Sequence, residues 1–432
     1  MPRRALEYLP GQIVVRVHEA AVRPHVAARR LAIAAETAEL LPDSVAEPLD
    51  FIARSVGVRD AWPLFAAARP GRQAALRPHE RLPVAVARSV AESESEELAG
   101  LTVVELRRRE VSPELLQRVS SAPGIDFAEP IPARWLSASP RPDPRRNRQW
   151  GLRAIRWFEA NRPSARRVTV AVVDTGIDRE HPDLEGVVTA YDHRGTSARD
   201  VVGHGTHVGG IIAGRVNDEA GASGVADCRL AMWKVFPDEP AQGNFYVDGP
   251  RFLQALNEVG EAGAKVLNLS LGGTSSSQTE QLLFSRLERL GVTVVAAMGN
   301  EYQRGNPVEY PAAYDGVFAV GSIAEPDTRS PFSNTGRHIG LTAPGSNVLS
   351  TLPRTSSPYR AVTGYASWSG TSMATPHVAA VAALLAAKHS DWTAHDIKAQ
   401  LQASARRVAG MGRKKRTDEY GPGVVDLQAA LS

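Results

Sequence analysis

Cysteine is almost absent from this chain, and neither sign of charge is in clear excess. Among 432 residues there is one cysteine, Cys228, which excludes an internal disulfide framework and a cysteine-rich metal site. Lysine and arginine number 50 against 47 aspartate and glutamate, a formal charge of +3. Nucleic-acid-binding proteins usually carry a larger or more clustered basic excess. We therefore expect no nucleic-acid partner, and we expect Cys228 to be a small buried hydrophobic residue.

Long apolar runs are missing as well. No stretch of about 18 apolar residues occurs, so the sequence predicts no membrane span. Near the N-terminus, Glu7, Pro10 and Arg16 interrupt the apolar region that a secretory signal needs. The longest apolar run, around 378–387, is rich in alanine and predicts a buried helix. These features favour a cytoplasmic protein, with secretion as the alternative.

What the chain does have is the composition of a globular protein. Apolar residues make up 43% and charged residues 22%, which is enough for a sizeable core and excludes disordered and fibrous chains. At about 100–200 residues per domain, the length predicts two or three domains. Residues 137–148 read SASPRPDPRRNR, are rich in proline and arginine, and lack periodicity. They predict a linker, and exposed linkers of this kind are preferred sites of proteolytic cleavage.

The segment before the linker, residues 1–136, predicts a small α+β domain. Ser112, Pro113 and Glu114 form a good helix start, with an N-cap, a proline and a first-turn acid. Glu92–Glu97 reads ESESEE and predicts a solvated loop. The expected elements are strands at 12–17, 101–106 and 125–129, a helix at 22–41 and the helix from Ser112 to about Gly124.

The segment after the linker, residues 149–432, alternates strands with helices. Val168–Val173 is a continuous apolar strand, as in a parallel sheet that is covered on both faces. This alternation predicts a doubly wound α/β domain with a mostly parallel sheet. Further strands are expected at 230–235, 264–270, 292–297 and 317–320.

Three segments of this second domain carry candidate chemistry. VAVVDTGID places Asp174 at the carboxyl end of a strand, which is the edge where open α/β sheets bind ligands. GHGTHVGGIIAG places His204 at the start of a helix, and SGTSMATPHV places Ser372 at the start of a long helix. A helix start presents free N–H groups and partial positive charge. A hydroxyl there lies where backbone donors can meet a developing oxyanion.

An acid, an imidazole and a hydroxyl together indicate acyl transfer. Serine is a weak nucleophile until a base removes its proton, and histidine can be that base near neutral pH. A buried carboxylate fixes the tautomer of the imidazole and stabilises the imidazolium.

The three segments resemble the Asp, His and Ser signatures of the subtilisin-like serine proteases, the subtilase family. HGTHV and GTSMATPHV are highly specific, and the order Asp, His, Ser is that of subtilisin. The resemblance runs from Gln149 to Asp426. It implies a serine endopeptidase that acts on polypeptides, needs no cofactor for its chemistry, and uses Asp174, His204 and Ser372 as a catalytic triad. The alternative is a non-hydrolytic, peptide-binding scaffold with the same fold.

A fourth matching segment is VVAAMGNE. Its Asn300 aligns with the oxyanion-hole asparagine of the family, whose carboxamide would act together with the backbone N–H of Ser372. The alternative is that Asn300 is only a turn residue after Gly299.

Several neighbouring residues suggest other chemistry. His204 and His207 form a His-x-x-His pair that could bind a metal, but no third ligand motif accompanies it, so His207 is expected to be a packed helix residue. The glycines between Gly203 and Gly209 have the wrong spacing for a dinucleotide loop and are expected to let the helix approach the sheet. Ser369 is the other serine near the helix start, and the motif selects Ser372.

The resemblance also implies a substrate pocket. Glu301 follows Asn300, and Glu309 aligns with the pocket floor. Carboxylates there would favour Arg or Lys at P1, a residue that the linker supplies at Arg148. The alternative is that Glu309 points to water. The walls are expected from Ser270, Leu271, Gly272 and Gly273, whose backbone should pair with an extended substrate, and from Ala297, Met298 and Gly299, with Gly243–Tyr246 at the outer subsites.

Relatives in the family often bind calcium near the start of the mature chain. The matching side chains are Gln149, Asp183 and Asn217, with carbonyl groups of Arg215, Glu219 and Gly221. This mixture of oxygen ligands suits structural calcium, which takes about 6–8 of them. The alternative is a salt-linked surface loop.

The resemblance implies that the first 148 residues are a propeptide. We expect them to inhibit the enzyme until the linker is cleaved, with the segment FAEPIPARWL lying in the cleft as a substrate-like strand. The alternative is a permanent domain that binds a partner or regulator.

Overall fold

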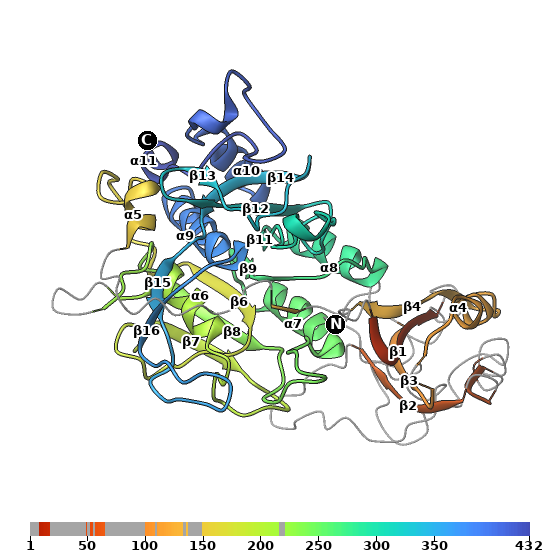
Figure 1. Ribbon diagram of the computed structural model, residues 1–432. Coiled ribbons are helices and arrows are strands. Elements are labelled where there is room, and N and C mark those ends of the chain that lie inside the picture. Colours follow the sequence, from red (N-terminus) through yellow and green to blue (C-terminus); the bar gives the residue numbers. More distant parts are fainter. Residues whose placement is uncertain are drawn as a thin grey trace. The chain divides into compact units, whose positions relative to one another are not determined.

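The computed structural model describes residues 8–17, 49, 52–54, 57–64, 100–108, 110–132, 135–136, 149–215 and 221–432. The chain divides into two compact units, Met1–Ala133 with Ser277–Thr279, and Arg134–Ser276 with Glu280–Ser432. Figure 1 shows the helices and strands of each unit. The predicted helix at 22–41, the loop at 92–97 and the linker at 137–148 lie outside the described residues.

The described part of the first unit is an antiparallel sheet with a helix. The strands follow the order β2-β3-β1-β4, and the buried core includes Ile13, Val15, Val104 and Val119. Strands β1 and β4 are longer than the predicted 12–17 and 125–129, because they stay paired as far as Tyr8 and Pro132. Strand β3 has its predicted bounds, and β2 was not predicted. The bounds are β1 Tyr8–Val17, β2 Val58–Pro63, β3 Leu101–Leu106, α4 Pro113–Ser120 and β4 Ile125–Pro132.

Helix α4 begins where the sequence predicts. The Oγ of Ser112 accepts a hydrogen bond from the backbone N–H of Leu115, at 3.3 Å, and Pro113 occupies the first position, where a missing N–H costs nothing. The backbone N–H of Ala128 in β4 donates to the Oγ of Ser120, at 3.0 Å. The helix is thereby joined to the strand that follows it.

The second unit is built on a mostly parallel sheet, as the sequence predicts. The strand order is β13-β12-β11-β9-β6-β8-β7, with β14 also paired to β12, and only the β12–β13 pair is antiparallel. The strands are β6 Thr169–Asp174, β7 Val188–Asp192, β8 Arg229–Lys234, β9 Val266–Leu269, β11 Thr293–Ala297, β12 Val317–Ala324, β13 Thr328–Arg329 and β14 Ile339–Pro344.

The chain changes direction across this sheet at β6. Strands β8 and β7 lie on one side of β6, whereas β9, β11 and β12 follow on the other. In open α/β sheets, such a switch point opens a crevice at the carboxyl ends of the strands. Asp174 is the last residue of β6 and therefore lies at that edge.

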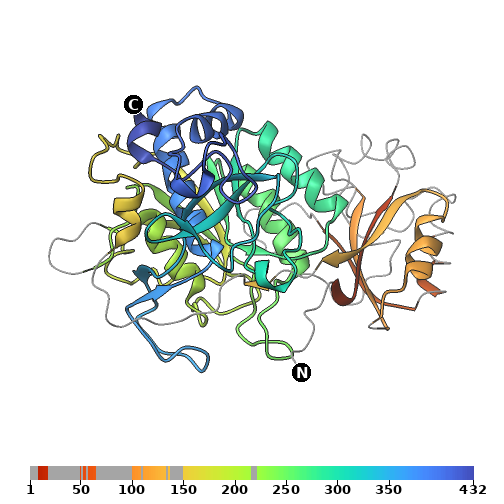
Figure 2. The same cartoon turned by 45° about the horizontal axis from the view of Figure 1, so that its top comes forward.

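Helices bury both faces of the sheet. Residues Val170–Asp174 are all buried, which is the pattern of a strand that is covered on both sides. Helices α6 and α9 pack against each other and against the sheet, and α7 and α8 lie apart from them (Figures 1 and 2). The helices are α5 Trp150–Ala154, α6 His204–Ala213, α7 Gly249–Glu261, α8 Gln278–Arg289, α9 Thr371–Lys388, α10 Ala394–Ala403 and α11 Leu427–Leu431.

Helix α9 is the central helix of this unit. Every residue from Thr371 to Leu385 is buried, so the helix is covered on all sides over this stretch. None of the described helices is long and apolar enough to cross a membrane. Two further strand pairs complete the unit, namely β5 Trp135–Leu136 with β10 Leu271–Gly272, and β15 Val348–Thr351 with β16 Tyr365–Trp368.

Candidate active site

Three chain segments that lie far apart in the sequence meet at the carboxyl edge of the sheet. Asp174 ends β6, His204 is the first residue of α6, and Ser372 is the second residue of α9. All three side chains are buried, with exposed fractions of 0%, 1% and 0%. The motif positions predicted from the sequence are therefore strand and helix ends in the structure.

The imidazole of His204 is held by the carboxylate of Asp174. Its Nδ1 lies 2.8 Å from Oδ1 and 3.0 Å from Oδ2 of that carboxylate. This contact assigns the proton of the neutral ring to Nδ1, because an ionised carboxylate only accepts. Nε2 is buried and has no hydrogen-bond partner among the described residues. It is therefore left as the basic nitrogen of the ring.

Glycine next to His204 makes this close approach feasible. A Cβ on Gly205 would lie 2.1 Å from the backbone oxygen of Gly176 and 3.1 Å from the Cβ of Asp174. A Cβ on Gly209 would lie 2.7 Å from Ile177. The prediction that small residues let this helix approach the sheet is confirmed.

A second carboxylate, Asp200, orders the start of α6. It accepts hydrogen bonds from the backbone N–H groups of Gly203 and Thr206, at 2.8 and 2.9 Å, and from the hydroxyls of Thr175 and Thr206, at 2.8 and 2.6 Å. Burial raises the pKa of the Asp200 carboxyl, and these donors oppose the rise. The Oγ1 of Thr175 accepts from the N–H of Gly205, at 2.9 Å. Asp200 was not predicted from the sequence, although an acid shortly before a helix often caps its N-terminus.

Ser372 is held through its hydroxyl and its carbonyl. Its Oγ donates to the backbone oxygen of Ser270, at 2.9 Å, and the Oγ of Ser270 donates to the backbone oxygen of Ser372, also at 2.9 Å. The hydroxyl of Ser372 is therefore directed to Ser270 rather than to Nε2 of His204. Asn268 supports the pair, since its Nδ2 donates to the Oγ of Ser270, at 3.0 Å.

The carboxamide of Asn300 has one end fixed and one end free. Oδ1 accepts from the backbone N–H and the hydroxyl of Thr371, at 2.9 and 3.0 Å. This fixes the orientation of the amide, so Nδ2 faces the opposite way. Nδ2 is buried and donates to no described residue. Asn300 is thus joined to the residue before Ser372 and keeps an unused N–H donor.

His207 and Cys228 are structural residues. His207 is fully buried, its Nε2 lies 3.1 Å from the backbone oxygen of Ala366, and its ring stacks on Trp368 with centroids 4.9 Å apart. Burial lowers the pKa of His207 to about 3 and raises the pKa of the buried Cys228 thiol to about 12. No group of three or more His, Cys, Asp or Glu residues among those described could hold a metal ion.

The expected pocket walls and floor are in contact with one another. Gly273 and Tyr310 pair through both backbone groups, at 2.9 and 2.7 Å. A Cβ on Gly299 would lie 2.2 Å from Oε1 of Glu309. The side chain of Glu309 is fully buried, and its Oε1 accepts from Nδ2 of Asn334, at 2.9 Å. The alternative in which Glu309 points to water is therefore wrong.

Other expected pocket residues have more local roles. Oε2 of Glu301 accepts from the backbone N–H of Asn300, at 2.6 Å, so this carboxylate turns back onto its own chain segment. Leu271 and Gly272 pair antiparallel with Leu136 and Trp135, so an extended segment from before the linker occupies the edge of this wall. Ala297 and Met298 are buried, and Asn244 closes a small turn by pairing with Ala241.

The calcium ligands expected from the resemblance are present in part. The backbone N–H of Ala222 donates to Oδ2 of the buried Asp183, at 2.8 Å, and Oε1 of Gln149 accepts from the backbone N–H of Ser223, at 2.9 Å. A Cβ on Gly221 would lie 2.6 Å from Oδ1 of Asp183, so the backbone approaches this carboxylate closely. Asn217 and Glu219 lie outside the described residues.

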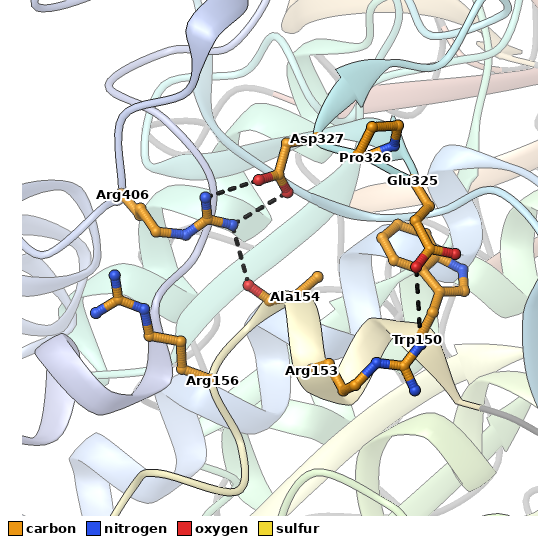
Figure 3. A pocket seen from close by; sticks show the side chains of 8 residues that line it. All are labelled: Trp150, Arg153, Ala154, Arg156, Glu325, Pro326, Asp327 and Arg406. Atoms are coloured by element: carbon orange, nitrogen blue, oxygen red, sulfur yellow. Dashed lines mark hydrogen bonds and ion pairs between the residues drawn. The ribbon is translucent and has the colours of Figure 1, made fainter.

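A separate cavity of about 350 Å³ opens beside α5, and none of the site residues above lines it. Four of its charged side chains form two ion pairs across it, Arg406 with Asp327 and Arg153 with Glu325 (Figure 3). Arg406 binds both oxygens of Asp327, at 2.7 and 3.1 Å, and the backbone oxygen of Ala154, at 3.1 Å. Arg153 lies 3.7 Å from Glu325. The cavity is a charged surface feature and contributes nothing to the candidate active site.

Comparison with known proteins places the chain in a family. The model of the subtilase family of peptidases matches residues 165–423. The chain is 34% identical over 269 residues to subtilisin of Bacillus pumilus, covering 61% of this chain and 90% of that protein. It is 37% identical over 352 residues to the M-protease of Shouchella clausii, covering 80% and 84%.

A solved structure is similar over almost the whole chain. The crystal structure of fervidolysin from Fervidobacterium pennivorans, a keratinolytic enzyme related to subtilisin, matches 99% of this chain with a TM-score of 0.70 and 25% identity. This chain spans 62% of the length of fervidolysin. The fold and the family match thus define a subtilisin-like hydrolase. The chain belongs to the subtilase family and is a serine endopeptidase that acts on polypeptides and needs no cofactor for its chemistry.

Proposed function

We propose that Asp174, His204 and Ser372 hydrolyse peptide bonds through an acyl-enzyme. The observation that carries this proposal is the 2.8 Å contact between Nδ1 of His204 and Asp174, which leaves Nε2 buried and unpaired among the described residues. In the first step, the hydroxyl of Ser372 leaves the carbonyl of Ser270 and donates to Nε2. As Nε2 takes the proton, Oγ attacks the peptide carbonyl, and Asp174 stabilises the resulting imidazolium.

The oxyanion would be stabilised by the free amide of Asn300 and by the backbone N–H of Ser372. Nδ2 of Asn300 has no partner to give up among the described residues, and N–H groups in the first turn of α9 lack acceptors within the helix. The imidazolium then protonates the leaving amine and the acyl-enzyme forms. His204 then deprotonates a water that attacks the ester, and it returns this proton to Oγ of Ser372 as the acid leaves, which regenerates the hydroxyl.

The test is hydrolysis of a quenched fluorescent peptide library by the wild type and by Ser372→Ala and His204→Ala. We expect both variants to lose turnover while their thermal unfolding stays close to that of the wild type. Ser367→Ala is the matched control, because Ser367 is also buried and its Oγ has no partner among the described residues. Turnover that survives in Ser372→Ala would contradict the proposal.

A preference for Arg or Lys at P1 is the second part of the proposal. The support is the position of Glu309, whose buried carboxylate lies directly against Gly299 in the expected wall of the pocket. A cation at the pocket floor would pair with this carboxylate in a desolvated setting. We expect Glu309→Gln to lower kcat/KM for peptides with Arg at P1 far more than for peptides with Leu at P1. Equal losses for both peptides would exclude Glu309 from specificity.

Self-processing in the linker at 137–148 is the third part. The support is the antiparallel pairing of Trp135–Leu136 with Leu271–Gly272, because a substrate strand would add to the same wall. The next residue of that wall, Ser270, binds Ser372. We propose that residues 1–148 inhibit the enzyme until this linker is cut. Mass spectrometry of the wild type and of Ser372→Ala tests it, and equal processing of the two would exclude self-cleavage.

We also propose a structural calcium ion next to Asp183. The support is the buried carboxylate, together with the close backbone approach at Gly221 and the neighbouring amide of Gln149. Calcium would stabilise the chain next to Asp183 without taking part in the chemistry. Calorimetric titration of EDTA-treated protein tests this site independently of activity. No binding heat, together with an unchanged melting temperature, would contradict it.

A further inference from the structure

Pro376 lies one turn after Ser372 and removes one backbone hydrogen-bond donor from α9. In a regular helix the N–H of residue i+4 donates to the carbonyl of residue i, and proline has no N–H. The carbonyl of Ser372 therefore lacks its regular donor within α9. Ser372 is fully buried, so water does not reach this carbonyl, and an unpaired buried carbonyl is costly.

The hydroxyl of Ser270 supplies the missing donor. Its Oγ donates to the backbone oxygen of Ser372, at 2.9 Å, and it accepts from Nδ2 of Asn268, at 3.0 Å. Because the amide of Asn268 occupies one lone pair, the proton of the Ser270 hydroxyl is directed toward Ser372. Ser270 and Asn268 are both fully buried, so solvent does not compete for these bonds.

Of the two hydrogen bonds between Ser270 and Ser372, we expect one to break during turnover and the other to persist. The bond from Oγ of Ser372 to the backbone oxygen of Ser270 breaks when the nucleophile turns to His204. The bond from Oγ of Ser270 to the backbone oxygen of Ser372 does not involve the reacting hydroxyl and persists. The main chain of Ser372 thus stays fixed while its side chain reacts.

We propose that the Ser270 side chain is a positioning residue, which holds the main chain of Ser372 by replacing the helical donor that Pro376 lacks. This role is separate from that of the Ser270 backbone in the expected wall of the pocket. The inference rests on the proposed function, because it concerns the residue proposed as the nucleophile.

A double-mutant cycle tests it, with kcat and KM measured for wild type, Ser270→Ala, Pro376→Ala and the double variant. We expect Ser270→Ala to lower kcat by about 10–100-fold with little change in KM, because the orphaned carbonyl lets the nucleophile shift. In the double variant, the Pro376→Ala substitution introduces a backbone N–H that restores the helical bond. We therefore expect most of the lost kcat to return, whereas Pro376→Ala alone stays near the wild type.

The outcomes separate this inference from the proposed function. Ser367→Ala is the matched buried-serine control and is expected to keep its kcat. The positioning role is overturned if the wild type is active and Ser270→Ala keeps its kcat. It is also overturned if Ser270→Ala loses kcat and the added Pro376→Ala substitution does not restore it. A properly folded wild type without peptidase activity overturns the proposed function itself. Thermal unfolding of each variant distinguishes a local shift from a loss of folding.

Discussion

Asn300 offers the sharpest test of how this site stabilises charge. Its Nδ2 is buried and unpaired among the described residues, so removing it breaks no described hydrogen bond in the resting enzyme. The loss should then appear almost wholly in the transition state, as a lower kcat with little change in KM. In subtilisin, one side-chain donor of the oxyanion hole is worth about 10²–10³ in kcat, or about 2.7–4 kcal/mol.

The choice of substitution matters, because Oδ1 of Asn300 accepts two hydrogen bonds from Thr371. Asn300→Ala removes the donor and also leaves these two groups unpaired at the start of α9. Asn300→Asp keeps an acceptor for Thr371 and replaces the donor with a carboxylate oxygen, so its effect on kcat does not come from lost contacts with Thr371. We expect both variants to lose about 10²–10³ in kcat, and Asn300→Asp to lose at least as much as Asn300→Ala, because its charge repels an oxyanion.

Steady-state kinetics on one peptide, with thermal unfolding of each variant, is the assay. A kcat for Asn300→Asp within tenfold of the wild type would refute the oxyanion role. If only Asn300→Ala were impaired, Asn300 would act through Thr371 as a structural residue. A fall in kcat that is accompanied by a clear fall in melting temperature would also indicate that Asn300 has a structural role.

Three further predictions concern packing and titration. Gly205→Ala should destabilise the fold by about 1–3 kcal/mol and abolish activity, because its Cβ would lie 2.1 Å from the oxygen of Gly176. A melting temperature equal to that of the wild type would contradict this. Burial lowers the pKa of His207 to about 3 from its ordinary 6.5, so stability present above pH 6.5 should be lost as the pH falls toward 3. His207→Phe should flatten that decline in the free energy of unfolding, and an unchanged slope would refute the assignment. Burial also raises the pKa of Cys228 to about 12, so a thiol reagent should label it only after denaturation, and rapid labelling of the native protein would contradict its burial.

The sequence predicted best those features that local patterns determine. The strand ending at Asp174 and the helices starting at His204 and Ser372 follow from apolar runs, glycines and motif positions, and the structure has them at those residues. The mostly parallel sheet follows from continuous apolar strands of the kind seen at Val170–Asp174.

Features that depend on distant residues could not be predicted in the same way. Asp200 accepts hydrogen bonds from Thr175, Gly203 and Thr206, and these groups come together only when β6 and α6 pack. Glu309 is buried because Asn334 and Gly299 lie against it, whereas a glutamate in a loop is usually exposed. Strand β5 is two residues long, too short for any periodicity to indicate that it pairs with β10.

Covalent trapping identifies the nucleophile of the site. The wild type is treated with a fluorophosphonate, digested, and mapped by mass spectrometry. We expect one adduct on Ser372, loss of hydrolysis in proportion to labelling, and no adduct in Ser372→Ala or in His204→Ala. An adduct on another residue, or full labelling without loss of hydrolysis, would contradict it.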